Sequence, residues 1–257
     1  MAEKSNIEWT THTFNPWIGC TKISPACDHC YAETWDNRFY ETSRWGAKAP
    51  RTRTKTWSGP RKWNRIAGET GERPRVFCAS LADVFDNHRS IQDVWRKDLW
   101  TLIKDTPNLD WLLLTKRPQN IKRYLPSDWG NGYANVWLGT TIENQVEYDR
   151  RIDVFTSIPA AVRFLSMEPL LGPVDLKGGK GLDWIIAGGE SGSLYREMKP
   201  EWVRSLRDQC FDANIPFLFK QWHGSSQKEI KAKGRAVDGT VHGDYPTPRT
   251  PELLTTT

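Results

Sequence analysis

Three cysteines near the start of the chain have a spacing that suits metal binding. Cys20, Cys27 and Cys30 follow the pattern C-x6-C-x2-C. Thiolates are soft ligands, and three of them suit a [4Fe–4S] cluster whose fourth iron lacks a protein ligand. Zinc is the alternative, because a structural zinc site takes four ligands and His29 or His12 could supply the fourth. We favour the cluster, since His29 lies between two of the cysteines and has little freedom to complete a tetrahedron.

The remaining cysteines and the N-terminus indicate a reducing compartment. Five cysteines are an odd number, and no apolar leader opens the chain, so a disulfide framework is not expected. Cys78 falls in a predicted strand and Cys210 in a predicted helix, where each is expected to be a small core residue. No apolar run reaches the ~18 residues that a membrane-spanning helix needs. We therefore expect a cytoplasmic protein without a membrane partner.

The apolar pattern predicts the elements that position the cysteines. After residue 75, short runs rich in β-branched and aromatic residues alternate with helical periodicity, which favours a parallel sheet. Strands are predicted at residues 7–14, 76–80, 111–115, 136–140, 162–166, 184–187 and 216–220, and helices at 91–103, 142–155 and 200–211. The second helix is expected to turn Ile142, Val146 and Ile152 inward.

These elements predict an α/β fold with mostly parallel strands. A full or partial (β/α) barrel fits about seven strands, and a doubly wound open sheet is the alternative. The barrel is expected to span residues 1–223, with a basic insertion at about 38–75. Residues 224–257 are polar and rich in Gly, Pro and Thr, and a loosely packed tail is expected there.

Polar side chains follow almost every predicted strand. Parallel strands bring their carboxyl ends to one edge, where α/β proteins place their chemistry. The charged residues at these ends are Asp83, Lys116, Glu143, Glu168, Glu190 and Lys220. Gly188 and Gly189 precede one of them and would let a ligand approach the backbone closely. Ordinary loop charges are the simpler interpretation of each residue, but the repetition from strand to strand favours one shared mouth.

Five longer motifs accompany the cysteine loop and the strand ends. They are residues 15–20 (NPWIGC), 114–118 (LTKRP), 166–172 (SMEPLLG), 188–192 (GGESG) and 219–222 (FKQW). These motifs resemble a phage and prophage family that has a three-cysteine motif and no assigned reaction. The cysteine loop followed by β/α units also resembles the radical S-adenosylmethionine (SAM) superfamily. That superfamily usually has C-x3-C-x2-C with an aromatic residue before the last cysteine, whereas this chain has a gap of six residues and His29 in that place.

The resemblance implies a barrel of the radical SAM type and a defined chemistry. Cys20, Cys27 and Cys30 would each ligate one iron of a [4Fe–4S] cluster, and SAM would chelate the fourth iron. One electron from a flavodoxin or ferredoxin would cleave SAM to methionine and a 5′-deoxyadenosyl radical, which abstracts a hydrogen atom from the substrate. The protein would supply binding, orientation and exclusion of water.

The same resemblance implies roles for the residues at the strand ends. Asp83 or Glu143 would bind the SAM ammonium group, and Lys116 or Arg117 would pair with its carboxylate. Glu168 and Glu190 are expected to hold the ribose hydroxyls or the substrate, and Lys220 is the third expected catalytic residue. The other expected cofactor-binding residues are His29, Gly188 and Gly189.

The basic segment predicts a nucleic-acid partner. Residues 38–75 hold eleven Lys or Arg against three Glu, with Trp45, Trp57 and Trp63 between them. Basic side chains contact phosphates and aromatic rings stack on bases, so this segment is expected to bind DNA rather than RNA. The expected contacts are Arg51, Arg53, Lys55, Arg61 and Lys62. A solvated surface loop is the simpler alternative.

These observations predict a radical SAM enzyme that modifies or rearranges a nucleobase, such as a base of phage DNA, in the host cytoplasm. One alternative is a non-catalytic module, stabilised by a metal, that binds nucleic acid. Others are radical SAM enzymes that act on a small molecule, a tRNA base or a DNA photoproduct.

Overall fold

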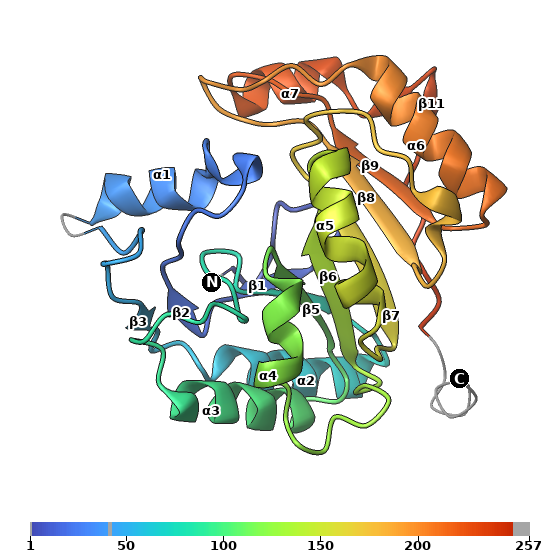
Figure 1. Ribbon diagram of the computed structural model, residues 1–257. Helices are drawn as coiled ribbons and strands as arrows, with labels where there is room; N and C mark the ends of the chain where they lie inside the picture. The colour runs from blue at the N-terminus through green and yellow to red at the C-terminus, as the bar shows by residue number, and fades with distance from the viewer. Residues whose placement is uncertain (1, 41–42, 249–257) are drawn as a thin grey trace.

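The computed structural model describes residues 2–40 and 43–248 and has a central sheet of parallel strands (Figure 1). The strand order is β1-β4-β5-β6-β7-β8-β9, and every neighbouring pair is parallel. The strands are β1 (His12–Phe14), β4 (Arg75–Cys78), β5 (Asp110–Thr115), β6 (Val136–Thr141), β7 (Val162–Met167), β8 (Trp184–Gly188) and β9 (Phe217–Gln221). The order follows the chain without reversal, so the sheet curls into a half-barrel. The prediction of a partial (β/α) barrel is confirmed, and the doubly wound alternative is excluded.

The sheet is buried on both faces, as its apolar strands require. One face packs against the helices through residues such as Trp111, Leu138 and Ile185. The inner face carries a second cluster, in which Trp137, Phe164 and Trp184 are in contact with one another or with their neighbours. Alternate residues of each strand therefore serve the two faces. Because both sets of alternating residues are buried, the strands carry almost no polar residues.

Helices connect the strands on the outer face. They are α2 (Gly59–Thr70), α3 (Asp93–Lys104), α4 (Ile121–Tyr124), α5 (Gln145–Thr156) and α6 (Pro200–Asp212). The prediction that Val146 of α5 faces inward is wrong, because this side chain is 72% exposed. The Asn144 side chain accepts a hydrogen bond from the Glu147 nitrogen and begins the helix at residue 145. Its inward face therefore carries Tyr148 and Phe155 instead.

The first strand is shorter than the predicted span of residues 7–14. The Thr10 nitrogen donates to the Ile7 oxygen at 3.1 Å, so a turn precedes β1. Trp9 lies within this turn and packs into the inner-face cluster, where the centroid of its ring is 4.7 Å from that of Phe77. Its apolar side chain is buried without belonging to the strand.

The segments outside the regular alternation carry structure of their own. Residues 38–75 include β3 (Thr52–Arg53), which pairs with β2 (Trp17–Ile18), and α2, which packs Trp63 and Ala67 into the core. The end of the chain includes α7 (Gln227–Lys233), β10 (Ala236–Val237) and β11 (Thr240–Val241). Residues 242–244 run beside β9, with Phe219 donating to the His242 oxygen and Asp244 to the Phe217 oxygen. The tail is therefore packed as far as residue 248, and the rest of it lies outside the described residues.

None of the helices described between residues 2 and 248 is long and apolar enough to cross a membrane.

Candidate active site

A cavity of about 690 Å³ lies at the carboxyl edge of the sheet. Its wall includes residues from the ends of β4, β5, β6, β7 and β9, together with the three-cysteine loop. This volume lies in the range of ~300–1,000 Å³ that small-molecule and cofactor sites occupy. Cys20, Cys27 and Cys30 all line it. The parallel topology thus brings the loop thiols and the strand-end side chains to one place.

The cysteine loop leaves the sheet at Gly19, where the backbone needs glycine. Gly19 has a φ of +113°, and a Cβ there would lie 2.4 Å from the Arg44 carbonyl oxygen. The loop then forms a 3₁₀ turn, η1 (Pro25–Cys27), and Cys30 precedes the helix α1 (Tyr31–Phe39). The three thiols therefore lie along one cavity wall, positioned by the bend at Gly19, by η1 and by the start of α1.

The Cys20 thiol is the one of the three that contacts the strand-end residue Arg117. Burial, and secondly the nearby carboxylate of Asp83, raises its pKa to about 11. Arg117 opposes this shift, with its Nη1 atom 3.6 Å from the Cys20 Sγ atom. Because a metal binds the thiolate rather than the thiol, ligation at Cys20 would release a proton.

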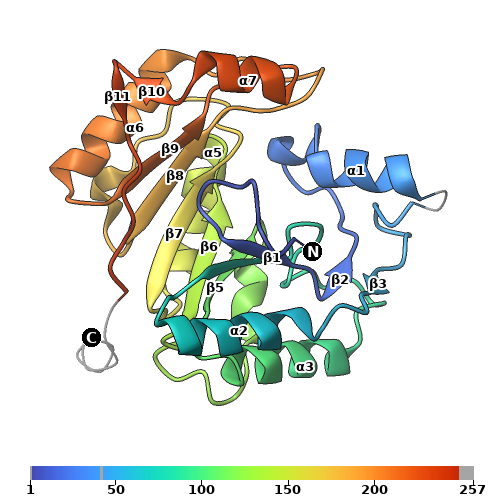
Figure 2. The same cartoon turned by 180° about the vertical axis from the view of Figure 1, so that it is seen from behind.

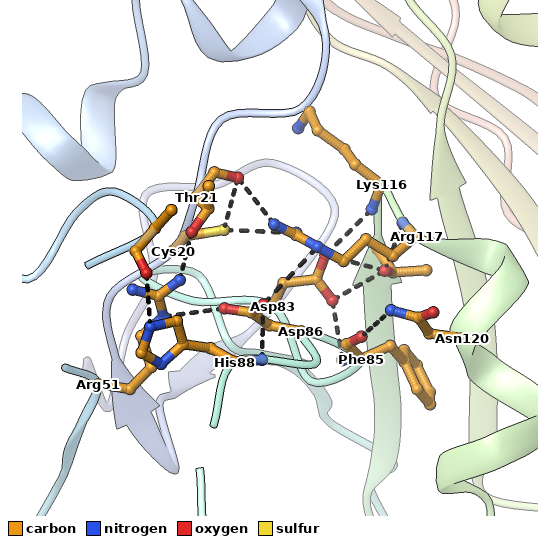
Figure 3. Close-up of polar contacts among 12 residues, drawn as sticks. Cys20, Thr21, Arg51, Asp83, Phe85, Asp86, His88, Lys116, Arg117 and Asn120 are labelled. Atoms are coloured by element: carbon orange, nitrogen blue, oxygen red, sulfur yellow. Dashed lines mark hydrogen bonds and ion pairs between the residues drawn. The ribbon is translucent and has the colours of Figure 1, made fainter. Parts of the chain in front are cut away.

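Asp83 organises the wall behind Cys20 (Figure 3). Its carboxylate accepts hydrogen bonds from the Thr115 hydroxyl at 2.8 Å and from Arg117 Nη1 at 2.9 Å. Arg117 also donates through Nη2 to the Thr21 oxygen at 2.8 Å. Both Asp83 oxygens are thus engaged by the protein, and the residue aligns Arg117 between the sheet and the cysteine loop.

The Lys116 side chain lies beside this network and points away from it (Figure 3). It lines the cavity, and Figure 3 shows its side chain extending away from Asp83 and Arg117. Within residues 2–40 and 43–248 its ammonium group has neither an ion pair nor a hydrogen bond. Of the two predicted partners for a SAM carboxylate, Lys116 is the available one, because Arg117 is already bonded.

Glu168 and Lys220 form an ion pair inside the cavity. Their Oε1 and Nζ atoms lie 2.8 Å apart. The other Glu168 oxygen accepts from the Trp9 indole nitrogen at 3.0 Å and from the Ser166 hydroxyl at 3.3 Å. The sequence predicted the two charged residues but not Trp9, which lies about 160 positions away and carries no local motif. The pair is half-enclosed and open to a ligand from the cavity side.

Glu143 has a different place from the one predicted. It is fully buried, it lies outside the cavity wall, and its Oε2 atom is 3.1 Å from Nη1 of Arg151 on α5. Its Oε1 atom accepts a hydrogen bond from the backbone nitrogen of Ala26 at 3.1 Å. The prediction that Glu143 binds the SAM ammonium is therefore wrong. The residue instead ties η1, next to Cys27, to the end of β6.

Glu190 and His29 form a second tie to the cysteine loop. The Glu190 carboxylate accepts from Arg196 Nη2 at 2.6 Å and lies 3.1 Å from His29 Nδ1. Arg196 also donates to the Pro25 oxygen at 3.0 Å. Burial opposes ionisation of Glu190, but these hydrogen bonds outweigh it and hold its pKa below the usual value. Neither residue lines the cavity, so the structure places them in a clamp rather than in contact with a ligand. Sequence reasoning missed Arg196.

The two glycines before Glu190 approach protein atoms. A Cβ on Gly189 would lie 2.2 Å from the His223 backbone nitrogen, and one on Gly188 would lie 3.1 Å from Glu168 Oε1. Gly189 also donates its backbone N–H to the Gln221 oxygen at 2.9 Å. Their small size thus lets β8 pack against the segment after β9. Neither lines the cavity, so the predicted approach of a ligand is not observed.

The predicted nucleic-acid contacts divide into one buried and four surface residues. The Arg51 side chain is 0% exposed and pairs with Asp86 at 2.9 Å, so its prediction as a phosphate contact is wrong. It also donates to the Thr21 hydroxyl, which places it behind the cysteine loop. Arg53, Arg61 and Lys62 form ion pairs with Asp98, Asp105 and Glu3, respectively, while Lys55 is exposed.

Three thiols from one loop are a donor set that suits a [4Fe–4S] cluster, in which each thiolate binds a separate iron. In the described part of the chain, no three Cys, His, Asp or Glu side chains are gathered closely enough to hold one metal ion. Neither predicted fourth zinc ligand joins the thiols: His29 bonds Glu190, and His12 stacks on Trp63 with 4.3 Å between ring centroids.

The fold and this cavity define a partial (β/α) barrel with a three-thiol loop at its mouth. The chain belongs to the family described as "Protein of unknown function (DUF5131)", whose model matches residues 4–246. No curated protein matches it. Membership of a phage and prophage family stays a prediction.

A solved structure supports the fold. The chain is similar to a cysteine-to-serine mutant of spore photoproduct lyase, with a TM-score of 0.50 and 12% sequence identity. The match covers 82% of this chain and 64% of the lyase chain. At this identity the similarity concerns the arrangement of the elements.

Proposed function

We propose that the protein is a radical SAM enzyme acting on a nucleobase. One observation carries the proposal: Cys20, Cys27 and Cys30, from one loop, line the same cavity as the polar ends of five parallel strands. Cys20, Cys27 and Cys30 would hold a [4Fe–4S] cluster, which would supply the one-electron chemistry that cleaves SAM to methionine and a 5′-deoxyadenosyl radical. A flavodoxin or ferredoxin is the proposed source of the electron.

The described side chains suit the binding of SAM and the exclusion of water. The ammonium group of Lys116, which pairs with no other described residue, suits the SAM carboxylate as the donor of a charge-assisted hydrogen bond. Arg117 and Asp83 hold the wall next to Cys20 in place. The Glu168–Lys220 pair suits ribose hydroxyls or the substrate, and its contact with Trp9 fixes its position. Trp9 and Phe77 of the inner-face cluster line the cavity, and such apolar lining helps to exclude water from a radical reaction.

Two observations support a nucleobase as the substrate. The similar solved structure is a spore photoproduct lyase. The cavity wall carries five cationic side chains against two carboxylates, which suits a polyanionic substrate: Lys22, Lys116, Arg117, Lys220 and Lys231 against Asp83 and Glu168. DNA is favoured over RNA, and base modification, for example of phage DNA in a host cytoplasm, is the leading reaction. Repair of a DNA photoproduct is the second candidate, because of the similar lyase.

Formation of 5′-deoxyadenosine tests the proposal. The protein is purified without oxygen, reconstituted with iron and sulfide, reduced with dithionite and incubated with SAM. Wild type is expected to form 5′-deoxyadenosine and methionine, and Cys27→Ala to form neither. Cys210→Ala is the matched control, because this buried cysteine of α6 lies outside the cavity. Zinc in the purified protein, with no SAM cleavage in wild type, would leave the metal-stabilised binding module as the function. Turnover of a small molecule without nucleic acid would favour the small-molecule enzyme.

A further inference from the structure

Two helices flank the cavity mouth and carry complementary binding groups. α1 and α7 lie on the same side of the molecule in both views, and α2 and α3 lie on the opposite side (Figures 1 and 2). Tyr31 of α1 and Lys231 of α7 both line the cavity. We propose that this mouth binds single-stranded nucleic acid, with bases stacked on α1 and phosphates beside α7. The inference rests on the proposed function, because it takes the cavity as the reaction site.

Helix α1 presents a row of aromatic rings to solvent. Tyr31, Trp35 and Phe39 recur every four residues and so share one face of the helix, and Tyr40 follows directly. They are 54%, 40%, 58% and 46% exposed, respectively. Trp35 lies 5.2 Å from Phe39 and 6.1 Å from Tyr40, measured between ring centroids. We call these four residues the α1 aromatic face. Water-exposed rings in such a row mark a binding surface rather than a core.

The α1 aromatic face is directed into the cavity at one end. The Tyr31 hydroxyl donates to the Ser80 oxygen at 2.8 Å, which fixes this ring against the loop after β4. Ser80 also lines the cavity. Tyr31 therefore joins the α1 aromatic face to the cavity that the thiols line, which suits a nucleotide drawn out of a strand.

The charges at the mouth favour a polyanion over a protein. Lys231 and Lys228 of α7 are exposed and, in the part of the chain that the structure describes, form no ion pair. Lys116 is a third such cation, deeper in the cavity. The cavity carboxylates Asp83 and Glu168 are each neutralised by an ion pair. The surplus positive charge complements phosphates, which dominate nucleic-acid affinity.

Unstacked bases are the form that this surface can bind. Aromatic faces stack on single-stranded bases of any sequence, whereas a duplex hides those faces. The basic segment predicted from the sequence is less suited, because Arg51 is buried and Arg61 and Lys62 lie on α2, on the other side of the molecule. The proposed binding surface is therefore the cavity mouth, rather than the basic side chains of residues 51–62.

Fluorescence anisotropy of labelled oligonucleotides tests this surface on the full-length, cluster-reconstituted protein. The probes are single-stranded DNA and RNA of about twelve nucleotides, within the usual site size, and duplex DNA of the same length. The variants are Trp35→Ala and Lys231→Ala. The matched controls are Phe211→Ala, an aromatic residue 83% exposed at the end of α6, and Lys97→Ala on α3. Both controls lie away from the cavity wall.

The proposal expects tighter binding of single strands than of the duplex. Trp35→Ala should weaken single-strand binding by roughly tenfold, the loss of one base stack. Lys231→Ala should reduce the slope of log affinity against log salt by about 0.7, the value of one phosphate contact on a single strand. Both controls should bind like wild type. The DNA and RNA probes show which strand is preferred.

Three results would overturn the proposal: no binding of single strands, equal binding of duplex, or equal losses in the variants and their controls. A loss in Trp35→Ala confined to electron transfer from the reductant would assign the α1 aromatic face to a protein partner instead. SAM cleavage is measured separately. Cleavage without oligonucleotide binding refutes this surface alone, and binding without cleavage refutes the enzyme alone.

Discussion

Replacing Glu143 distinguishes two roles for this residue: holding the cysteine loop against the sheet, or binding the cofactor. Glu143→Ala leaves the buried Arg151 with one carboxylate fewer and leaves the Ala26 N–H without its acceptor. Removing one partner of a buried ion pair costs about 3–5 kcal/mol. Arg151 keeps Glu147 and the Thr141 oxygen, so the lower end, about 3 kcal/mol, is expected. For a chain of this size that corresponds to a Tm lower by roughly 6–12 °C.

The assay combines thermal unfolding with thiol accessibility. Calorimetry gives the Tm, and the rate of reaction of the native apoprotein with a thiol reagent reports on Cys27 and Cys30. Glu147→Ala is the matched control, because it removes the other acidic partner of Arg151 and leaves the bond to Ala26 intact. Glu143→Ala should accelerate thiol modification and Glu147→Ala should not. Glu143→Gln keeps an oxygen acceptor for the Ala26 N–H and should retain most of the thiol protection.

One pattern of results would refute this interpretation. If Glu143→Ala left the Tm and the thiol reactivity unchanged but weakened SAM binding, Glu143 would be a SAM ligand. The tie between β6 and the cysteine loop would then have no energetic role.

Three further predictions concern the remaining contacts of the site. Arg196→Ala should lower the free energy of unfolding most above the unfolded carboxyl pKa of about 4.3. Because the folded pKa of Glu190 is lowered, the difference in unfolding free energy from wild type should disappear as the pH falls through that folded pKa. A difference that does not change with pH in denaturant titrations would contradict this. Lys116→Ala should weaken SAM binding about tenfold in calorimetric titration without changing the Tm, and an unchanged affinity would remove Lys116 from the site. Gly189→Ala places a methyl group 2.2 Å from a backbone nitrogen and should cost about 1–3 kcal/mol, whereas Gly172→Ala, whose nearest contact is 3.6 Å, should unfold like wild type.

The fold could be predicted because its strands are apolar, short and evenly spaced. All seven predicted runs correspond to strands of the sheet, and their chain order is their spatial order. The first was predicted too long, because Trp9 is buried by a turn rather than by a strand. Val146 was misplaced because the helix begins at residue 145, so Ile142 lies before it and shares no helix face with Val146.

The position of the site was predictable, but the roles of its charges were not. Strand ends place Lys116, Glu168 and Lys220 in the cavity. Glu143 and Glu190 have the same position in the sequence pattern, yet each forms an ion pair with an arginine, Arg151 and Arg196, respectively, that follows it by eight and six residues. A sequence does not show which carboxylate meets an arginine after folding. The same limit made the buried Arg51 resemble a surface cation.

The electron paramagnetic resonance spectrum of the reduced, reconstituted protein with and without SAM tests the central claim most directly. The account predicts a [4Fe–4S]⁺ spectrum in wild type that changes when SAM is added, and its loss in Cys20→Ala, Cys27→Ala and Cys30→Ala but not in Cys210→Ala. A protein that holds zinc, or a cluster whose spectrum is indifferent to SAM, would contradict it.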